Sequence, residues 1–188
     1  MEKTLRNTDS TFAGIAAIKN AQRDQLALFE AAAGGGRWDK IHGSHYDWWM
    51  FPVDSPSSHV LKWSVYADDI AELKRDPAFM QSYRRGVELL MEAWGWDLDE
   101  QRALTDRTTD QKWQKHPVRL YKAAYSLWLF GCETEFASLH KYALTLFGRG
   151  ENFIWNKDLS VFFTQGLDPY SGRQLYQPSS IGQESNPC

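Results

Sequence analysis

The chain has 188 residues, a formal net charge of −3 and a hydrophobic content of 43%. Its length fits one domain of about 150 residues with short additional segments. The charge offers no basic footprint for nucleic acid, and no apolar run approaches the roughly 18 residues that cross a bilayer. We therefore expect neither a nucleic acid nor a membrane as a partner, and the composition leaves the oligomeric state open.

Residues 1–10 and the two cysteines bear on the cellular compartment in which the protein is expected. Residues 1–10 lack the apolar centre of a signal peptide. Cys132 and Cys188 lie far apart in the sequence, which predicts neither a disulfide framework nor a metal site. We therefore expect a cytoplasmic protein in a reducing compartment, with no bound metal and no cofactor.

The first third of the chain predicts one long helix and then a loop. Residues 10–33 carry apolar side chains at helical spacing, and the three glycines at 34–36 end the pattern. Residues 38–58 are interrupted by Pro52 and Pro56 and are expected to be irregular. A loop this rich in aromatic rings is expected to be pinned against the helices.

The middle of the chain predicts three further helices, over residues 66–75, 77–94 and 117–129. Pro77 and Pro117 each follow a polar residue, and proline is favoured at the first position of a helix. The helix over residues 117–129 is apolar on most of its sides. Such a helix is expected at the centre of a bundle.

Two more helices are predicted, over residues 133–147 and 157–165. Strict two-residue alternation is rare along the chain, so the fold class is predicted to be all-α, a compact multi-helix bundle. After Gly166 the composition changes to Pro, Ser, Gln and Gly. We expect a single helical domain over residues 1–165 and a polar, flexible tail over residues 166–188.

Residues 40–52 concentrate two histidines, an aspartate, four aromatic rings and a proline. Large rings bury much area and their polar tips need partners, so this segment either closes a core or lines a pocket. The chain also holds nine tryptophans. Exposed rings near Trp94, Trp96 and Trp113 are expected if the protein acts through a partner surface instead.

The order Ser-His-Tyr-Asp-Trp-Trp-Met-Phe-Pro at residues 44–52 is similar to a motif of a known family. This is a small all-helical bacterial family of unknown function, sometimes mislabelled calpastatin, whose members carry Ser-His, then aromatic residues, then Phe-Pro. Further likenesses follow in the family's order over roughly residues 22–155: the helix at residues 25–30, Asp76-Pro77, the pattern of Lys122, Ser126, Leu129 and Phe130, and Phe147-Gly148. The resemblance implies an all-α fold and no particular reaction.

The chain departs from the family pattern at several positions. Tyr46 stands where the family usually has Trp, and Asp47 stands where it has a sulfur-containing or apolar residue. Asp76 replaces a histidine before the mid-chain proline, and residues 96–114 form a longer segment than usual. These differences indicate a divergent relative.

His45 and Asp47 are the candidate catalytic residues. A histidine beside a carboxylate in a ring-rich loop can act as a general base, and hydrolysis with either group directing a water is the simplest reaction. The competing interpretation is that His45 caps a helix or pairs with a buried carbonyl. His42 lies close in sequence, but Gly43 argues against the helical spacing that a shared metal would need.

Candidate ligand-binding residues come from the same loop and from the apolar helix. Trp48 or Trp49 could form the floor of a pocket on which a base stacks, unless both rings fill the core. Lys122 could hold an anion, and Arg119, one turn earlier, could double the positive charge. Ser126 follows one turn after Lys122. The alternatives for Lys122 are an extended surface side chain and an internal ion pair with Asp47.

Two functions remain open from the sequence. In the first, the protein binds a small anionic or nucleotide-like ligand in an aromatic-lined pocket, and hydrolytic activity is an additional possibility. In the second, the aromatic-rich loop is a structural clasp, and the protein is a non-catalytic structural or protein-interaction module. The sequence leaves undecided whether the protein is an enzyme.

Overall fold

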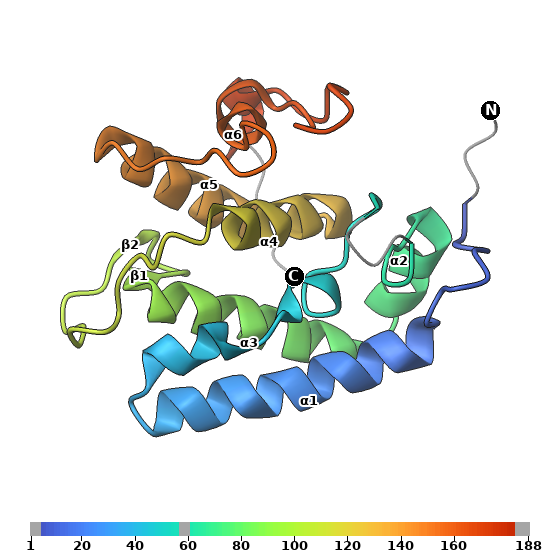
Figure 1. Ribbon diagram of the computed structural model, residues 1–188, viewed down its shortest axis with the longest axis horizontal. Helices are drawn as coiled ribbons and strands as arrows, with labels where there is room; N and C mark the ends of the chain where they lie inside the picture. Colours follow the sequence, from blue (N-terminus) through green and yellow to red (C-terminus); the bar gives the residue numbers. More distant parts are fainter. Residues whose placement is uncertain (1–4, 57–60, 183–188) are drawn as a thin grey trace.

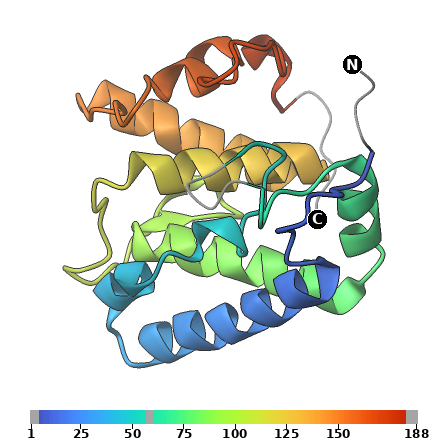
Figure 2. The same ribbon diagram turned by 45° about the vertical axis from the view of Figure 1, so that its right-hand side comes forward.

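The computed structural model describes residues 5–56 and 61–182, and its helices lie in successive layers. Figures 1 and 2 show α1, α3, α4, α5 and α6 one above another, which confirms the predicted all-α class. The α-helices are α1 (Ile15–Gly34), α2 (Ala67–Lys74), α3 (Pro77–Ala93), α4 (Pro117–Phe130), α5 (Glu133–Gly148) and α6 (Ser160–Gln165). The remaining elements are η1 (Trp38–Gly43), η2 (Tyr46–Trp48), η3 (Pro178–Ser180), β1 (Trp96–Asp97) and β2 (Arg102–Ala103).

The first helix begins at Ile15 and not at residue 10 as predicted. The carboxylate of Asp9 accepts hydrogen bonds from the backbone N–H and the hydroxyl of Thr11, which form a separate turn. Gly14 then has a φ of 87°, a left-handed conformation that separates this turn from the helix. The short polar side chain of Asp9 therefore stabilises a turn instead of capping the helix.

The predicted restarts at the two prolines are confirmed. The Asp76 carboxylate accepts hydrogen bonds from the backbone N–H groups of Ala78 and Phe79 at 3.0 and 3.2 Å, and Pro77 opens α3. Pro117 opens α4 in the same way, although His116 makes no capping bond through its side chain. The longer predicted helix at residues 157–165 begins only at Ser160, whose N–H and hydroxyl donate to Asp158.

Aromatic rings join α3 to α4 in the core. Tyr83 of α3 stacks on Phe130 of α4 with 5.0 Å between the ring centroids, and both side chains are fully buried. Gly86 lies one turn after Tyr83, and a Cβ atom there would lie 1.8 Å from Cε of the buried Met50. The glycine therefore lets the aromatic-rich loop approach α3 closely.

One short β-hairpin departs from the predicted absence of strands. Trp96 pairs with Ala103 and Asp97 with Arg102 in antiparallel register. The turn between them is held by Asp97, whose carboxylate accepts hydrogen bonds from the N–H groups of Asp99 and Glu100. Strands this short carry no alternation that a sequence pattern could reveal.

The polar segment after α6 lies against the helices over its described residues, 166–182. The Tyr176 hydroxyl donates to the carbonyl of Phe162, and Arg173 contacts Tyr125 and Asp54. Its predicted flexibility stays a prediction, and residues 183–188 lie outside the described part. These contacts bring the C-terminal segment to the same side of the bundle as the loop at Asp54.

Replacing Gly166 by alanine is expected to destabilise the protein because the C-terminal segment passes too close. Gly166 has a φ of 66°, and a Cβ atom there would lie 2.0 Å from the carbonyl oxygen of Tyr176. Strain at such a φ costs roughly 1–2 kcal/mol for a residue other than glycine. Gly172→Ala is the matched control, since Gly172 has a φ of 69° with open space around it. Chemical unfolding should show the larger loss for Gly166→Ala, and equal losses would contradict the close packing.

Candidate functional site

Arg119 of α4 holds the beginning of the aromatic-rich loop. Its guanidinium donates to the carbonyls of His42 and Ser44, both at 3.1 Å, and to Nδ1 of His42 at 3.0 Å. The guanidinium carbon also lies 4.8 Å from the centroid of the Tyr46 ring. Arg119 is buried, so its charge is used inside the protein and does not lie free in a pocket.

Lys122 holds the next part of the loop, one turn further along α4. Its Nζ lies 2.8 Å from Oδ2 of Asp47 and 5.1 Å from the centroid of the Trp48 ring. Burial lowers the pKa of the lysine, and the charge of Asp47 acts in the opposite direction. The internal ion pair, which was one of the alternatives left open by the sequence, is the one observed.

Ser126 and Tyr125 hold the end of the loop. The Ser126 hydroxyl donates to the carbonyl of Pro52 at 2.8 Å and accepts a hydrogen bond from the Tyr83 hydroxyl at 2.9 Å. The Tyr125 hydroxyl donates to Oδ1 of Asp54 at 2.6 Å. These bonds leave the Ser126 side chain fully buried and already paired.

The loop therefore runs along α4 in the same direction as the helix. Arg119, Lys122 and Ser126 recur at helical spacing, so they share one face of α4. Each successive side chain binds a later part of residues 42–52. The loop is held against α4, as the sequence predicted, and this row of contacts is compatible with the structural clasp, one of the two interpretations that the sequence left open.

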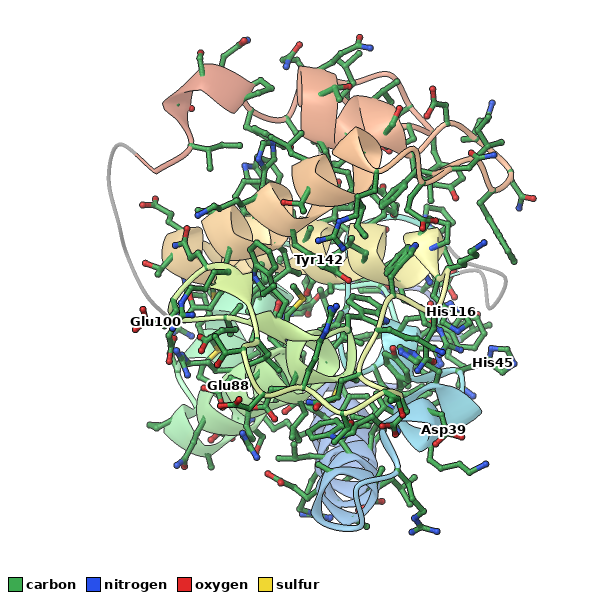
Figure 3. All side chains as sticks on the ribbon, turned by 90° about the vertical axis from the view of Figure 1, so that its left-hand side faces the viewer. Asp39, His45, Glu88, Glu100, His116 and Tyr142 are labelled. Atoms are coloured by element: carbon green, nitrogen blue, oxygen red, sulfur yellow. The ribbon has the colours of Figure 1, made fainter. Side chains whose placement is uncertain are left out.

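The aromatic residues of the loop pack both on one another and on rings outside the loop. His45 stacks on Trp48 with 5.6 Å between centroids, and Trp49 lies 5.4 Å from Trp63. His45 is exposed and points away from the helices (Figure 3). The gap beside Lys122 has a volume of only about 10 Å³, about the smallest space that holds one water. The catalytic roles of His45 and Asp47, and ligand binding by Trp48, Trp49, Arg119, Lys122 and Ser126, stay predictions.

The tryptophans that could mark a partner surface are covered. Trp94 is 1% exposed and Trp96 is 4% exposed, while Trp113 is half-buried. The Trp94 ring stacks between other rings, 6.1 Å from that of Tyr142 and 5.5 Å from that of His42. These side chains therefore build the core at one end of the bundle and form no exposed patch.

A much larger opening, which was not predicted, is lined by Asp54 and Arg173, the two residues bonded to the Tyr125 hydroxyl. This cleft, which we call the Arg173 cleft, has a volume of about 820 Å³ and its lining surface is mainly apolar. Five segments that are far apart in the sequence meet there. They contribute Leu5; Asp54, Ser55 and Pro56; Tyr66, Ala67, Ile70, Ala71 and Lys74; Leu129; and Asp168, Ser171 and Arg173.

Two polar residues of the lining, Arg173 and Asp54, are joined to each other and to Tyr125 of α4. Nη2 of Arg173 donates to Oδ2 of Asp54 at 3.2 Å and to the Tyr125 hydroxyl at 3.0 Å. Burial lowers the pKa of Arg173, but Tyr125 and Asp54 raise it more, so the charged form is favoured. Burial and then Asp54 raise the pKa of Tyr125, which keeps its hydroxyl protonated as a donor.

Arg173 keeps unused hydrogen-bond donors in the lining of the cleft. Both of its bonds come from Nη2, whereas Nε and Nη1 donate to no residue within 5–56 and 61–182. Its side chain is 38% exposed, so these N–H groups are within reach of a ligand. A planar guanidinium with free N–H groups is suited to bind a carboxylate or phosphate.

The acidic groups of the Arg173 cleft are already paired. Asp168 is buried, and its carboxylate accepts hydrogen bonds from the Tyr170 N–H and the hydroxyls of Ser171 and Tyr121. Asp54 accepts from Tyr125 and Arg173, as above. Asp54 therefore positions the guanidinium of Arg173, and Asp168 is occupied by its own hydrogen bonds.

Lys74 is the second cation of the Arg173 cleft. It is exposed and makes no ion pair within the described part of the chain. Its Nζ lies beside Gly131, the residue that caps the C-terminus of α4. A positive charge there also suits the negative end of the α4 dipole, so Lys74 can serve the helix and the cleft together.

Comparison with known protein families, with curated proteins and with solved structures gives no match for this chain. The resemblance to the bacterial family therefore stays a prediction that rests on the motif residues. Among the described helices, none is long and apolar enough to cross a membrane. Across the same residues no group of three or more His, Cys, Asp or Glu side chains is arranged to hold a metal ion.

Proposed function

We propose that the protein binds a small amphipathic molecule with one anionic group in the Arg173 cleft. The observation that carries this proposal is a guanidinium with unused donors in the lining of a mainly apolar cleft of about 820 Å³. Ligand pockets commonly measure about 300–1,000 Å³ and combine apolar walls with a few polar groups. This proposal keeps the anionic ligand predicted from the sequence and moves its binding site.

The apolar walls favour a ligand with an aliphatic body. Ile70 and Ala71 of α2 and Leu129 of α4 contribute apolar side chains to the lining. Tyr66 is the single aromatic ring among the described residues that line it, so a stacked base has little surface to rest on. A hydrophobic carboxylate matches these walls better than a nucleotide, because its body is apolar and its charge is at one end.

The first test is a binding screen by thermal unfolding and isothermal titration calorimetry. The panel contains octanoate and decanoate as amphipathic carboxylates, AMP and glucose 6-phosphate as polar phosphates, and octanol as the uncharged analogue. We expect the carboxylates to stabilise the protein, by about 2.7 kcal/mol at a hundredfold excess over Kd. Octanol should bind more weakly, since it lacks the negative charge that would pair with the guanidinium of Arg173.

Two variants localise this binding. Arg173→Gln removes the positive charge, and Ala71→Leu fills part of the cleft with a larger side chain. Each is expected to lower the affinity for octanoate at least about tenfold, which corresponds to about 1.4 kcal/mol of binding free energy. Arg102→Gln is the control, because Arg102 is an exposed arginine that does not line the cleft. Unchanged binding in both variants, or no binding to the wild type, would overturn the proposal.

The alternative function, a non-catalytic structural or interaction module, is favoured by one specific observation. Arg119, Lys122 and Ser126 hold the aromatic-rich loop along α4, so the loop contributes to the fold through contacts inside the protein. We infer that this loop is a clasp that supports the Arg173 cleft by fixing Asp54. Under this proposal the clasp and the ligand site are two parts of one protein.

A further inference from the structure

A second cleft lies where the end of α4, the start of α5 and the C-terminal segment meet. We call it the Trp128 cleft; it has a volume of about 470 Å³. Its lining differs from that of the Arg173 cleft, because aromatic rings and a carboxylate dominate and no lysine or arginine contributes among the described residues. The lining residues are Trp128, Glu133, Phe136, Tyr176, Ser180, Ile181 and Gly182. We propose that the Trp128 cleft binds an organic cation of the quaternary ammonium class.

Three rings of different orientation border the Trp128 cleft. The ring of Tyr176 is nearly perpendicular to that of Phe136, with 5.1 Å between their centroids, and it is tilted by 39° from that of Trp128 at 6.4 Å. The face of an aromatic ring is negative, so a cation placed over it is attracted. Rings that meet at steep angles can present surface to a rounded cation from more than one side.

The rings are held in place before any ligand binds. The Tyr176 hydroxyl donates to the carbonyl of Phe162, and its ring packs at 75° on that of Phe162 with 5.4 Å between centroids. Phe136 is 5% exposed, and Trp128 packs on Tyr125 with 6.0 Å between ring centroids. A pre-ordered set of rings loses little side-chain entropy when a ligand binds.

The charge of the Trp128 cleft favours a cation over an anion. Glu133 is exposed at the first position of α5 and forms no ion pair with the described residues. Its charge also suits the positive end of the α5 dipole, so the carboxylate has a structural use besides the proposed one. Rings plus one carboxylate match a cation that is large, poorly hydrated and apolar at its surface, as a trimethylammonium group is.

This inference does not depend on the proposed function of the Arg173 cleft. The two clefts share no lining residue: the Arg173 cleft contains the cations Arg173 and Lys74 together with the paired carboxylates Asp54 and Asp168, whereas Glu133 is the charged group among the described residues of the Trp128 cleft. Loss of octanoate binding in Arg173→Gln would therefore leave ammonium binding unchanged. Each variant is the control for the other cleft.

The test is a calorimetric and NMR titration of the full chain with tetramethylammonium and with choline. The comparison ligand is 3,3-dimethylbutan-1-ol, which has nearly the shape of choline and no charge. We expect saturable binding of both cations and at least about tenfold weaker binding of the alcohol, because cation–π attraction requires the charge. Equal affinity for choline and the alcohol would overturn the proposal, as would an absence of saturable binding by either cation.

Two variants locate the cation. Trp128→Leu keeps an apolar side chain but removes one ring, and it should lower the affinity for choline about tenfold or more. Glu133→Gln changes an exposed side chain and should weaken choline about threefold or more at low salt, with the difference shrinking as salt is added. Arg173→Gln should leave choline binding unchanged. If Glu133→Gln folds as the wild type does and binds choline with unchanged affinity and salt dependence, the carboxylate part of the proposal fails.

Discussion

Replacing Lys122 by alanine is expected to lower the free energy of unfolding by about 3–5 kcal/mol, the usual cost of leaving a buried charge without its partner. Lys122 and Asp47 are 13% and 8% exposed in their side chains, and their charged atoms lie 2.8 Å apart. Alanine removes the ammonium, the contact with the Trp48 ring and the packing of the lysine stem. The measurement is equilibrium unfolding in urea at neutral pH.

A double replacement separates the ion pair from its surroundings. Lys122→Met combined with Asp47→Leu removes both charges and keeps apolar volume, so it should cost much less than Lys122→Ala alone. Lys62→Ala is the matched control, since Lys62 is exposed and its Nζ likewise lies over a tryptophan, 5.4 Å from the centroid of the Trp63 ring. A loss below about 1 kcal/mol for Lys122→Ala would match an exposed pair and contradict the buried clasp.

The same variants decide what the residues predicted from the sequence do. If Lys122 serves only the clasp, Lys122→Met with Asp47→Leu should still bind octanoate, because neither residue lines the Arg173 cleft. If Lys122 holds the ligand, as the sequence first suggested, binding should disappear while the fold persists. The stability measurement therefore tests the structural role of Lys122 and Asp47, and the octanoate titration separately tests whether they bind the ligand.

The helices were the part of the fold that could best be predicted from the sequence. Pro77 and Pro117 fix where α3 and α4 begin, because proline lacks a backbone N–H and fits the first turn. The apolar character of α4 correctly indicated a buried helix, and ten of its residues are buried. The start of α1 was predicted wrongly because Asp9 and Ser10 both suit a cap, and only the observed turn shows which bonds Asp9 makes.

The candidate site was harder to predict because its parts meet only in three dimensions. The bond between Tyr125 and Asp54 joins residues 71 positions apart, and that between Arg173 and Asp54 joins residues 119 positions apart. Nothing local marks Arg173, which lies in a segment whose composition predicted a flexible tail. By contrast, the contact of Lys122 with Asp47 could be anticipated, since a lysine on an apolar helix needs a nearby acid.

His42 occupies a position where a positive charge would be costly. Arg119 can only donate, so Nδ1 of His42 is the acceptor and the proton of the neutral ring is assigned to Nε2. The His42 ring stacks on Trp94 at 5.5 Å and lies 4.6 Å from that of His116. Burial lowers the pKa of His42 to about 2, and the charges of His116 and Arg119 act in the same direction.

Acidification should therefore destabilise the fold through His42. An unfolded histidine titrates near a pKa of about 6.5, so below that pH the unfolded chain binds a proton that the folded chain excludes. The resulting loss of stability begins as the pH falls through about 6.5 and amounts to about 2–3 kcal/mol by about pH 4.5. It continues to grow until the pH approaches the folded value of about 2. Unfolding in urea at neutral pH and near pH 4.5 measures the difference.

The contribution of His42 can be isolated by two substitutions. His42→Gln keeps an acceptor for Arg119 but cannot take up a proton in this range, so its loss of stability between the two pH values should be about 2–3 kcal/mol smaller than that of the wild type. His45→Gln removes an exposed histidine and leaves the contact of Arg119 with His42 intact, so the acid-induced loss due to His42 should persist. If His42→Gln loses as much stability on acidification as the wild type, the proton is taken up elsewhere and His42 is not the acid-sensitive residue. If its loss is smaller as expected, the junction of η1 with α4 is where acid weakens the clasp.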